Sequence, residues 1–428
     1  MKLFFASIRN ELRHVHAAIA TAAILQCALA TVALSAEPAE VGVHWAQRSA
    51  DAPVSDTIDL RLTGHDLGNV EVFREGIMIA RAEVSADGTS ATAHIDTRQF
   101  VNGPVTFTAH AWNGRAGKAF TDEADAGALR LTVSNSGPMS NTRELLGVFV
   151  GNQPAAIVDF EGWLGRQVDG ILSYTGDANW KDYESVGWAA YSVWGQIDRP
   201  VFWSIPLIPK GATLAEAATG AYNDHYRKAA EILVGLRPAE PYMHIRTGWE
   251  FNGSWMHWSA LGKEKEFIGA YRQFVTTYRA VAKEHGVPDK FIFEWNVACG
   301  DYGMNPETAY PGDAYVDIIG MDFYWNPKYD PKDPIAAWHW KVNRPYGLKW
   351  HQTFAAAHGK RTSYSEWGVQ GDNAGPYIER AKAWFTKHAV VFHSYWDSNS
   401  AFPGKLSSEQ YPHAAAAFYE AFHAAAKP

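Results

Sequence analysis

Residues 242–258 read YMHIRTGWEFNGSWMHW. The apolar residues at the start predict a buried strand, and the Asn, Gly and clustered aromatic residues that follow predict a turn at its end. Glu250 falls at that end, between Trp249 and Phe251. Aromatic walls take water away from a carboxyl group and raise its pKa, which suits a general acid near neutral pH. The alternative is a glutamate on a solvated rim beside core tryptophans.

The chain around this stretch alternates strand-like apolar runs with amphipathic helices. The runs lie at residues 145–150, 170–174, 201–205, 242–248, 291–296, 316–324, 362–366 and 390–396. Between the fourth and fifth runs, apolar residues recur every three or four positions from Phe267 to Val281, and Gly286 and Pro288 end this helix. The pattern predicts a (β/α)8 barrel over 145–428, with catalytic groups at the C-terminal strand ends. A doubly wound open sheet is the alternative.

The region before the barrel has a different period. Apolar and polar residues alternate in short runs at 57–63, 70–73, 77–84, 91–95, 105–112 and 129–133, separated by turn signals such as Asp87-Gly88. Short alternating strands predict an antiparallel β-sandwich over residues 37–135, followed by a linker at 136–144. The order of the strands resembles bacterial immunoglobulin-like modules. Such a module binds glycan or acts as a spacer, and the sequence leaves both roles open.

The first residues have the pattern of a targeting segment. Lys2, Arg9 and Arg13 precede an apolar, alanine-rich stretch at 17–34, and small residues follow it. This pattern predicts a signal peptide over residues 1–36 and a secreted or periplasmic protein. The stretch is also about long enough to span a bilayer, so an uncleaved anchor, and with it membrane contact, is the alternative.

Composition narrows the classes of partner. The chain of 428 residues has a formal net charge of −8, which argues against nucleic acid as the main partner. Aromatic residues make up 14%, with 18 Trp, and sugars offer the flat apolar faces on which such rings stack. No glycine-rich phosphate loop follows the first barrel run, which disfavours a nucleotide site. The His and Cys spacings match no metal site, so we expect no cofactor and no metal.

A second glutamate occupies a position like that of Glu250. Glu366 lies in residues 361–368, RTSYSEWG, at the end of the seventh run, and an aromatic residue and a glycine follow it. Glycoside hydrolysis uses a pair of carboxyl groups as its catalytic groups. Two carboxyl groups that come from separate barrel strands and point into one mouth fit this requirement. One must be protonated to assist the leaving oxygen, and the other must be ionised. We expect Glu294 and Asp322, on the fifth and sixth runs, to join polar networks in the same mouth.

The order of these motifs resembles glycoside hydrolase family 26, the β-mannanase family of retaining (β/α)8 enzymes. The stretch WEFNGSWMHW matches the family's fourth-strand motif, and the resemblance implies that Glu250 is the acid/base. Ser365-Glu366-Trp367-Gly368 matches the seventh-strand motif and implies that Glu366 is the nucleophile. Residues 309–325, AYPGDAYVDIIGMDFYW, resemble the sixth-strand signature, in which Tyr324 would hydrogen-bond the nucleophile.

One departure from the family pattern concerns the substrate. Mannanases of this family usually carry His before the acid glutamate, and this chain has Trp249 there. The resemblance therefore implies a retaining endo-β-glycanase acting on a polysaccharide or oligosaccharide, with β-mannan or glucomannan, mixed-linkage β-glucan and a bacterial exopolysaccharide all left open. The alternative is a catalytically inactive, glycan-binding barrel that acts as an adhesin or as an accessory protein of exopolysaccharide biosynthesis.

Further residues of the mouth are predicted to bind substrate or to orient the two glutamates. These are Arg246, Trp249, Asn252, Trp255, Trp258, Asp322, Tyr324, Trp325, Trp367 and Trp396. Tyr174 and Trp203, near the ends of early runs, are weaker candidates of the same kind. For each of these residues, packing in the core or holding a loop is the alternative to a contact with sugar.

Overall fold

The computed structural model of the protein describes residues 41–47, 49, 52–114, 122–137 and 143–424. The predicted signal peptide at 1–36 and residues 138–142 of the predicted linker lie outside these ranges. Within the described ranges, no helix combines the length and the apolar character needed to cross a membrane.

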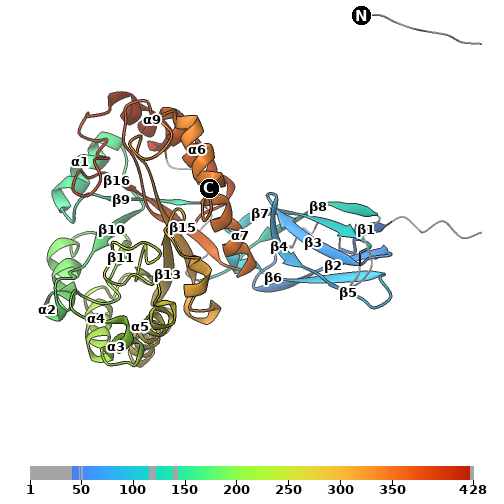
Figure 1. The fold of residues 1–428 in the computed structure, drawn as a ribbon, viewed down its shortest axis with the longest axis horizontal. Helices are drawn as coiled ribbons and strands as arrows, with labels where there is room; N and C mark the ends of the chain where they lie inside the picture. The colour runs from blue at the N-terminus through green and yellow to red at the C-terminus, as the bar shows by residue number, and fades with distance from the viewer. Residues whose placement is uncertain (1–40, 48, 50–51, 115–121, 138–142, 425–428) are drawn as a thin grey trace, which may run out of the picture. The chain divides into compact units, whose positions relative to one another are not determined.

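The N-terminal part of the described chain is an antiparallel β-sandwich (Figure 1). One sheet has the strand order β1-β2-β6-β5 and the other the order β4-β3-β7-β8. The strands are β1 (Gly42–Trp45), β2 (Thr57–His65), β3 (Asn69–Arg74), β4 (Ile77–Arg81), β5 (Glu83–Val84), β6 (Ser90–Asp96), β7 (Gly103–Trp112) and β8 (Glu123–Val133). The alternating apolar residues of both sheets, Leu60 and Phe107 among them, form one buried core between the sheets.

The structure corrects two details of the predicted sandwich. The run at 77–84 was expected to be one strand, but it forms β4 and β5, which belong to opposite sheets. The chain changes sheet at Ala82, whose N–H bonds to the carbonyl of Val70. Strand β1 was not predicted, because a strand from Gly42 to Trp45 is too short to display an alternating pattern.

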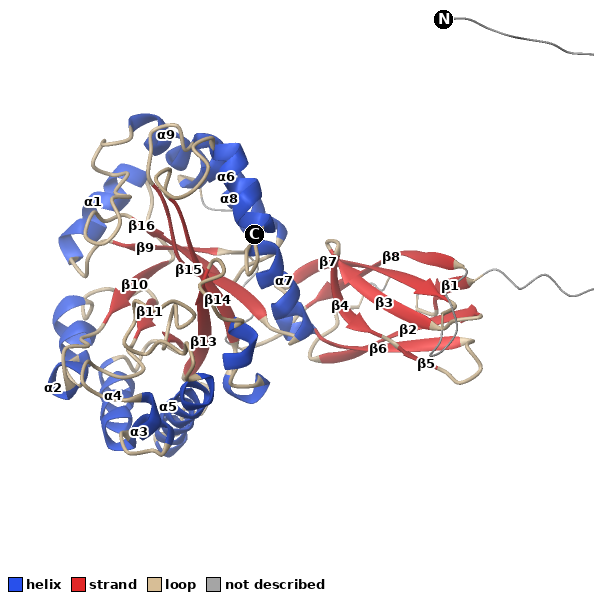
Figure 2. Ribbon diagram, in the orientation of Figure 1, coloured by secondary structure: helices blue, strands red, loops and turns tan. Residues whose placement is uncertain are grey.

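The larger part of the chain is a closed barrel of eight parallel strands, as predicted (Figure 2). Its strands are β9 (Leu145–Phe149), β10 (Gly170–Tyr174), β11 (Val201–Ser204), β12 (Met243–Arg246), β13 (Phe291–Ala298), β14 (Ile318–Trp325), β15 (Arg361–Val369) and β16 (Phe392–Trp396). Strand β16 pairs with β9, so the sheet closes on itself and the alternative of an open sheet is excluded. Strand β12 ends at Arg246, and Glu250 therefore belongs to the turn after the strand.

Helices surround the barrel in the described chain. They are α1 (Pro154–Leu164), α2 (Trp180–Tyr183), a π-helix (Trp188–Val193), α3 (Leu214–Ala218), α4 (Asn223–Leu236), α5 (Glu264–Glu284), α6 (Pro334–Asn343), α7 (Leu348–Ala357), α8 (Gly375–Lys387) and α9 (Pro412–Phe422), with short 3-10 turns at Pro306–Ala309 and Asp313–Tyr315. Helix α5 buries the predicted stripe from Phe267 to Val281. Its amphipathic face is what holds it on the strands.

Each barrel strand is buried on both faces, as expected of a parallel sheet covered by helices. Phe202 of β11 points into the barrel, where it stacks on Phe392 at a centroid distance of 4.0 Å. The next residue, Trp203, belongs to the other core, between strands and helices. Trp203 therefore has no access to the barrel mouth, and its weaker prediction as a substrate contact is wrong.

Candidate active site

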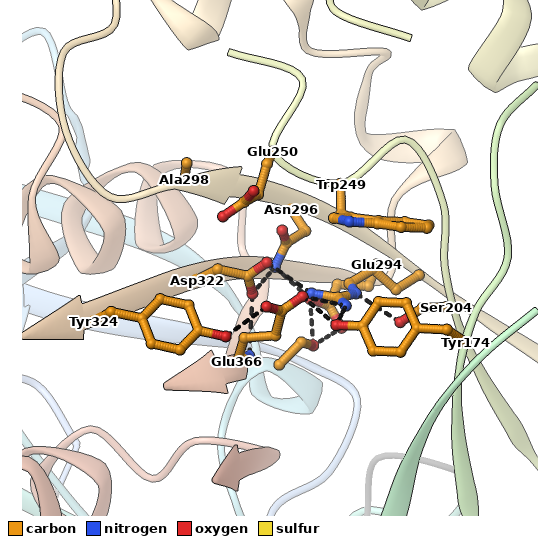
Figure 3. A network of polar contacts seen from close by, with 12 residues as sticks. Tyr174, Ser204, Trp249, Glu250, Glu294, Asn296, Ala298, Asp322, Tyr324 and Glu366 are labelled. Atoms are coloured by element: carbon orange, nitrogen blue, oxygen red, sulfur yellow. Dashed lines mark hydrogen bonds and ion pairs between the residues drawn. The ribbon is translucent and has the colours of Figure 1, made fainter. Parts of the chain in front are cut away.

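Arg246, the last residue of β12, is the centre of a buried polar network at the C-terminal ends of the barrel strands. Figure 3 shows this network with Tyr174, Asp322, Tyr324 and Glu366 labelled. Its guanidinium donates hydrogen bonds to Ser204 Oγ at 2.9 Å, Asp322 Oδ2 at 2.7 Å, Tyr174 Oη at 2.7 Å and Glu366 Oε1 at 2.6 Å. Strands β10, β11, β12, β14 and β15 all supply a member of this network. The planar fork of one arginine thus ties together separate strands of the barrel.

Glu366, the predicted nucleophile, is held as an anion by this network. Its Oε2 accepts a hydrogen bond from Tyr324 Oη at 2.6 Å, and its Oε1 accepts bonds from Tyr174 Oη and Arg246. Burial opposes the charge, but the positive charge of Arg246 and the three hydrogen bonds outweigh it and lower the pKa of Glu366. Glu366 is therefore ionised at neutral pH.

A β-bulge in β15 gives Glu366 its direction. The register between β14 and β15 shifts between Asp322 and Gly320, and two neighbouring residues of β15 then point into the barrel. Ser365 Oγ donates to Glu294 while the next side chain, Glu366, reaches Arg246. Tyr364 and Trp367 on either side pack outward against the helices. A regular strand would have sent Ser365 and Glu366 to opposite faces.

Glu250, the predicted acid, sits on a turn with left-handed backbone. Its φ is 51°, and its N–H bonds to the carbonyl of Asn296 at 3.1 Å. Asn252 fixes the same turn to the end of β13, because its side-chain amide donates to Ala298 O at 2.9 Å and accepts from Ala298 N–H at 2.8 Å. A non-glycine residue with positive φ costs free energy, and it is commonly retained where it aims a functional side chain.

The surroundings of Glu250 favour its protonated form. Burial in the cleft and the negative charge of Glu366 raise its pKa to about 7, although part of the side chain remains accessible. The indole N–H of Trp255 donates to Glu250 Oε2 at 2.6 Å, and this bond and the charge of Arg246 oppose the rise. Slightly below pH 7, the two glutamates therefore have different protonation states.

Two further carboxyl groups share the charge of Arg246. Asn296 donates to Glu294 Oε1 at 3.0 Å and to Asp322 Oδ1 at 2.9 Å. Burial raises the pKa of both acids, because one guanidinium cannot balance every carboxylate around it. The oxygens of Asp322 also accept from Arg246 and from the N–H of Glu366 at 3.1 Å. Asp322 thereby orients the arginine and the nucleophile strand.

Three predicted tryptophans lie at the site. The ring of Trp249 lies 5.2 Å from the guanidinium of Arg246 and faces the network (Figure 3). Trp396 lies between the two tyrosines that hold Glu366, with its centroid 6.1 Å from Tyr174 and 6.2 Å from Tyr324. Its indole nitrogen is buried and has no hydrogen-bond partner in the described chain. Trp255 is 50% exposed at the mouth. Their contacts with sugar stay predictions.

Four of the predicted substrate contacts are wrong because the side chains are buried in protein. Trp258 is 1% exposed and donates its indole N–H to Trp249 O. Trp325 and Trp367 point outward from β14 and β15 into the helix layer and have no exposed ring face. Asn252 is 1% exposed, and its amide is used in the bonds to Ala298.

Sequence reasoning undervalued or missed three residues of the network. Tyr174, a weaker candidate, contacts both Arg246 and Glu366. Ser204 and Asn296 were not predicted at all. Tyr174 and Ser204 are the last residues of β10 and β11, so the rule that functional groups occupy C-terminal strand ends could have found them. In the described residues, no group of three or more His, Cys, Asp or Glu is arranged to hold a metal ion.

Residues 213–366 match the family model described as Glycosyl hydrolase family 26. The matched residues include the end of β12, the turn of Glu250 and Glu366, so the matched segment contains both predicted catalytic glutamates. The resemblance stated from the three motifs is borne out over this segment.

Among known proteins, the chain is 25% identical to "Endoglucanase H" of Acetivibrio thermocellus over 306 residues, which are 65% of this chain and 30% of that protein. It is 32% identical to "Mannan endo-1,4-beta-mannosidase" of Bifidobacterium adolescentis over 124 residues, 29% of this chain and 12% of that protein. The chain thus spans less than a third of either relative. A solved modular endo-beta-1,4-mannanase from Cellulomonas fimi aligns with a TM-score of 0.44 at 17% identity, over 64% of this chain and 71% of that chain.

Proposed function

We propose that the chain is a retaining glycoside hydrolase that cleaves a β-linked polysaccharide by double displacement. The proposal rests on the difference in pKa between two carboxyl groups in one barrel mouth. The pKa of Glu366 is lowered by Arg246 and its hydrogen bonds, while burial raises the pKa of Glu250 to about 7. A nucleophile that is ionised beside an acid that is protonated is what retaining hydrolysis requires.

In the first step, an oxygen of Glu366 attacks the anomeric carbon. The bond between that carbon and the glycosidic oxygen breaks, and the proton of Glu250 passes to the departing oxygen. The product is a covalent glycosyl-enzyme, and Glu250 becomes a carboxylate. The negative charge of Glu366 disappears when the ester forms, so the electrostatic cause of the high pKa of Glu250 weakens.

In the second step, Glu250 acts as a base. It takes a proton from a water molecule, whose oxygen attacks the anomeric carbon and displaces Glu366. The returning carboxylate is received by the hydrogen-bond donors that held it before, Arg246, Tyr174 and Tyr324. Donors fixed in place before the reaction stabilise this leaving group without reorganising.

The substrate is proposed from chemistry and from the relatives together. The names of the two relatives are those of a glucanase and a mannanase, so β-linked glucan and mannan are the first polymers to test. Trp249 fills the position before the acid where family mannanases usually carry His, which argues for a glycan other than plain mannan. The pattern of residues 1–36 supports export, and we propose that the protein acts outside the cytoplasm.

The test is product release from a panel of polysaccharides by the purified chain. The panel contains mannan, glucomannan, mixed-linkage β-glucan, β-1,3-xylan and an acidic bacterial exopolysaccharide, with Glu366→Ala as the control. We expect reducing ends from at least one polymer and none from the control. Binding without cleavage across the panel would contradict the proposal and favour an inactive glycan-binding barrel.

A further inference from the structure

A cavity of about 480 Å³ lies on the Glu250 side of the site. It is lined by the end of β13, the end of β14 and helix α6, and its members include Glu250, Tyr324, Tyr302, Trp340 and Arg344. Glu366 is not among the described residues that line it. Because a general acid faces the leaving group, this cavity is the place for sugar units on the leaving-group side of the scissile bond.

Arg344 is the unusual member of the cavity. It follows the last residue of α6, and its guanidinium lies 3.9 Å from the ring centroid of Trp340, which is 37% exposed. Its Nε is buried and has no hydrogen-bond partner, and the guanidinium forms no ion pair within the described part of the chain. Arginines in such surroundings ordinarily pair with an acid, because a partly buried charge without a partner is costly.

The other charged side chains of the cavity already have partners within the protein. Lys341 pairs with Asp330 at 3.0 Å, and the second oxygen of Asp330 accepts the N–H of Asn326 at 2.9 Å. Glu250 is protonated below about pH 7, and its carboxyl is bonded to Trp255. Arg344 is therefore the cation of the cavity that has no carboxylate opposite it.

The backbone is shaped to accommodate this guanidinium. A Cβ atom on Gly300, in the loop after β13, would collide with the guanidinium of Arg344. Gly300 has a φ of 135°, which residues with side chains rarely adopt, and its N–H bonds to Tyr346 O at 3.1 Å. A glycine at this point lets the β13 loop pass directly against the arginine. The guanidinium thus lies between this loop and the ring of Trp340.

We propose that Arg344 recognises a carboxylate on the substrate, so that the polysaccharide carries an acidic sugar unit on the leaving-group side of the cleaved bond. This inference rests on the proposed function and deepens it. A guanidinium offers paired N–H donors that match the two oxygens of a carboxylate, and stacking on Trp340 keeps the fork in one orientation. The carboxylate belongs to a uronic acid or to a pyruvate ketal, which present the same chemistry.

The experiment measures binding, so that it does not depend on turnover. The Glu366→Gln chain is titrated at low salt with oligosaccharides from xanthan and from glucuronoxylan, each beside its carboxyl-reduced form. Depyruvylated xanthan separates the ketal from the uronic acid. We expect at least one acidic ligand to bind about tenfold or more tightly than its reduced form, the effect of one charge-assisted hydrogen-bond pair. Added salt should diminish the preference.

Variants show whether Arg344 is the source of the preference. Arg344→Gln in the same background should bind the acidic and reduced forms equally, and Arg344→Lys should retain part of the preference. Arg130→Gln is the matched control, because it removes the same charge from an exposed residue of β8 in the sandwich. Melting temperatures of the variants confirm that they are folded.

Two results would overturn the inference. One is equal binding of acidic and reduced forms, or no binding of any acidic ligand, by the Glu366→Gln chain. The other is a preference that Arg344→Gln keeps. Cleavage of the polysaccharide panel by the unmodified chain is scored separately, so a glycanase without an acidic subsite is distinguished from a failure of the proposed function.

Discussion

The two carboxyl groups at the barrel mouth are held in opposite ways. Glu366 belongs to a strand, and its oxygens accept hydrogen bonds from Arg246, Tyr174 and Tyr324. Glu250 belongs to a turn with positive φ, and its carboxyl accepts a hydrogen bond from the indole of Trp255. Both are deep in the cleft, yet the pKa of Glu366 is lowered and that of Glu250 is raised to about 7.

The difference shows that donors, more than depth, decide the charge of a buried acid. Burial raises the pKa of both groups, and only Glu366 has a cation and enough donors to reverse the effect. The ionised Glu366 then adds to the rise at Glu250. Strand β15, which fixes Glu366, is therefore also part of what keeps Glu250 protonated.

Removing Glu366, the proposed nucleophile, should have the largest effect on activity. Glu366→Ala deletes the attacking oxygen, and we expect turnover to fall by roughly 10⁴- to 10⁶-fold, as for other covalent catalysts. The measurement is the rate of reducing-end release from the polymer that the panel identifies. Exogenous azide should restore part of the rate by attacking in place of the carboxylate. A loss below about tenfold would contradict the assignment.

Replacing Arg246 by lysine should shift the acid limb of the pH profile of kcat/KM. Arg246→Lys keeps a positive charge but loses the fork that reaches Ser204, Asp322 and Glu366 together. We expect kcat/KM to fall by about 10²- to 10³-fold, comparable with the loss of a preorganised donor. The pKa of Glu366 should rise, so the acid limb should shift to higher pH. An unchanged acid limb would show that Arg246 does not set the charge of Glu366.

The raised pKa of Glu250 should destabilise the folded chain at high pH. Its folded pKa of about 7 exceeds the ordinary value of 4.5, so its contribution to stability is complete below about pH 4.5 and is lost as pH rises past 7. Glu250→Gln stays neutral. We expect the variant to gain stability over the unmodified chain between pH 4.5 and 8, by at most about 3 kcal/mol because Glu250 is partly accessible. Denaturant unfolding at both pH values measures the gain, and an equal difference at both would contradict it.

Removing the indole donor of Trp255 should have the smallest effect on kcat/KM. Trp255→Phe keeps a ring but deletes the hydrogen bond that lowers the pKa of Glu250. We expect the alkaline limb of kcat/KM to move to higher pH by less than about one unit, with a modest change in rate. Tyr302→Phe is the control, because the ring of Tyr302 contacts the same indole at a centroid distance of 4.8 Å while its hydroxyl donates to Cys299 O. A downward shift in the Trp255 variant would contradict the account.

The sequence was sufficient to predict the barrel and the positions of the two glutamates at the ends of its strands. Runs of apolar residues at regular intervals indicated the strands, and short motifs placed Glu250 and Glu366 at the ends of the fourth and seventh. Arg246 and Tyr324 were also predicted, and the structure brings both to the side chain of Glu366. These residues could be predicted because each lies within or beside a short motif of consecutive residues.

The features of the site that the sequence did not show depend on contacts between residues that are far apart in the sequence. Tyr174 and Ser204 reach Arg246 only because the barrel closes, so their positions at strand ends do not by themselves show this contact. Trp325 and Trp367 were misassigned because strands buried on both faces have no polar side from which to read direction. The bulge that turns Glu366 inward is likewise invisible in the sequence, since it arises from pairing with β14.

We propose that Glu250 and Glu366 have separate protonation states and separate roles. The most direct test is the pH dependence of kcat/KM, which reports the first chemical step, for the unmodified chain and for Glu250→Ala on a phenyl glycoside of the sugar that the panel identifies. We expect the unmodified chain to lose activity above about pH 7, and we expect Glu250→Ala to lose this alkaline limb but keep the acid limb. An alkaline limb that persists unchanged in Glu250→Ala would contradict the assignment of the acid.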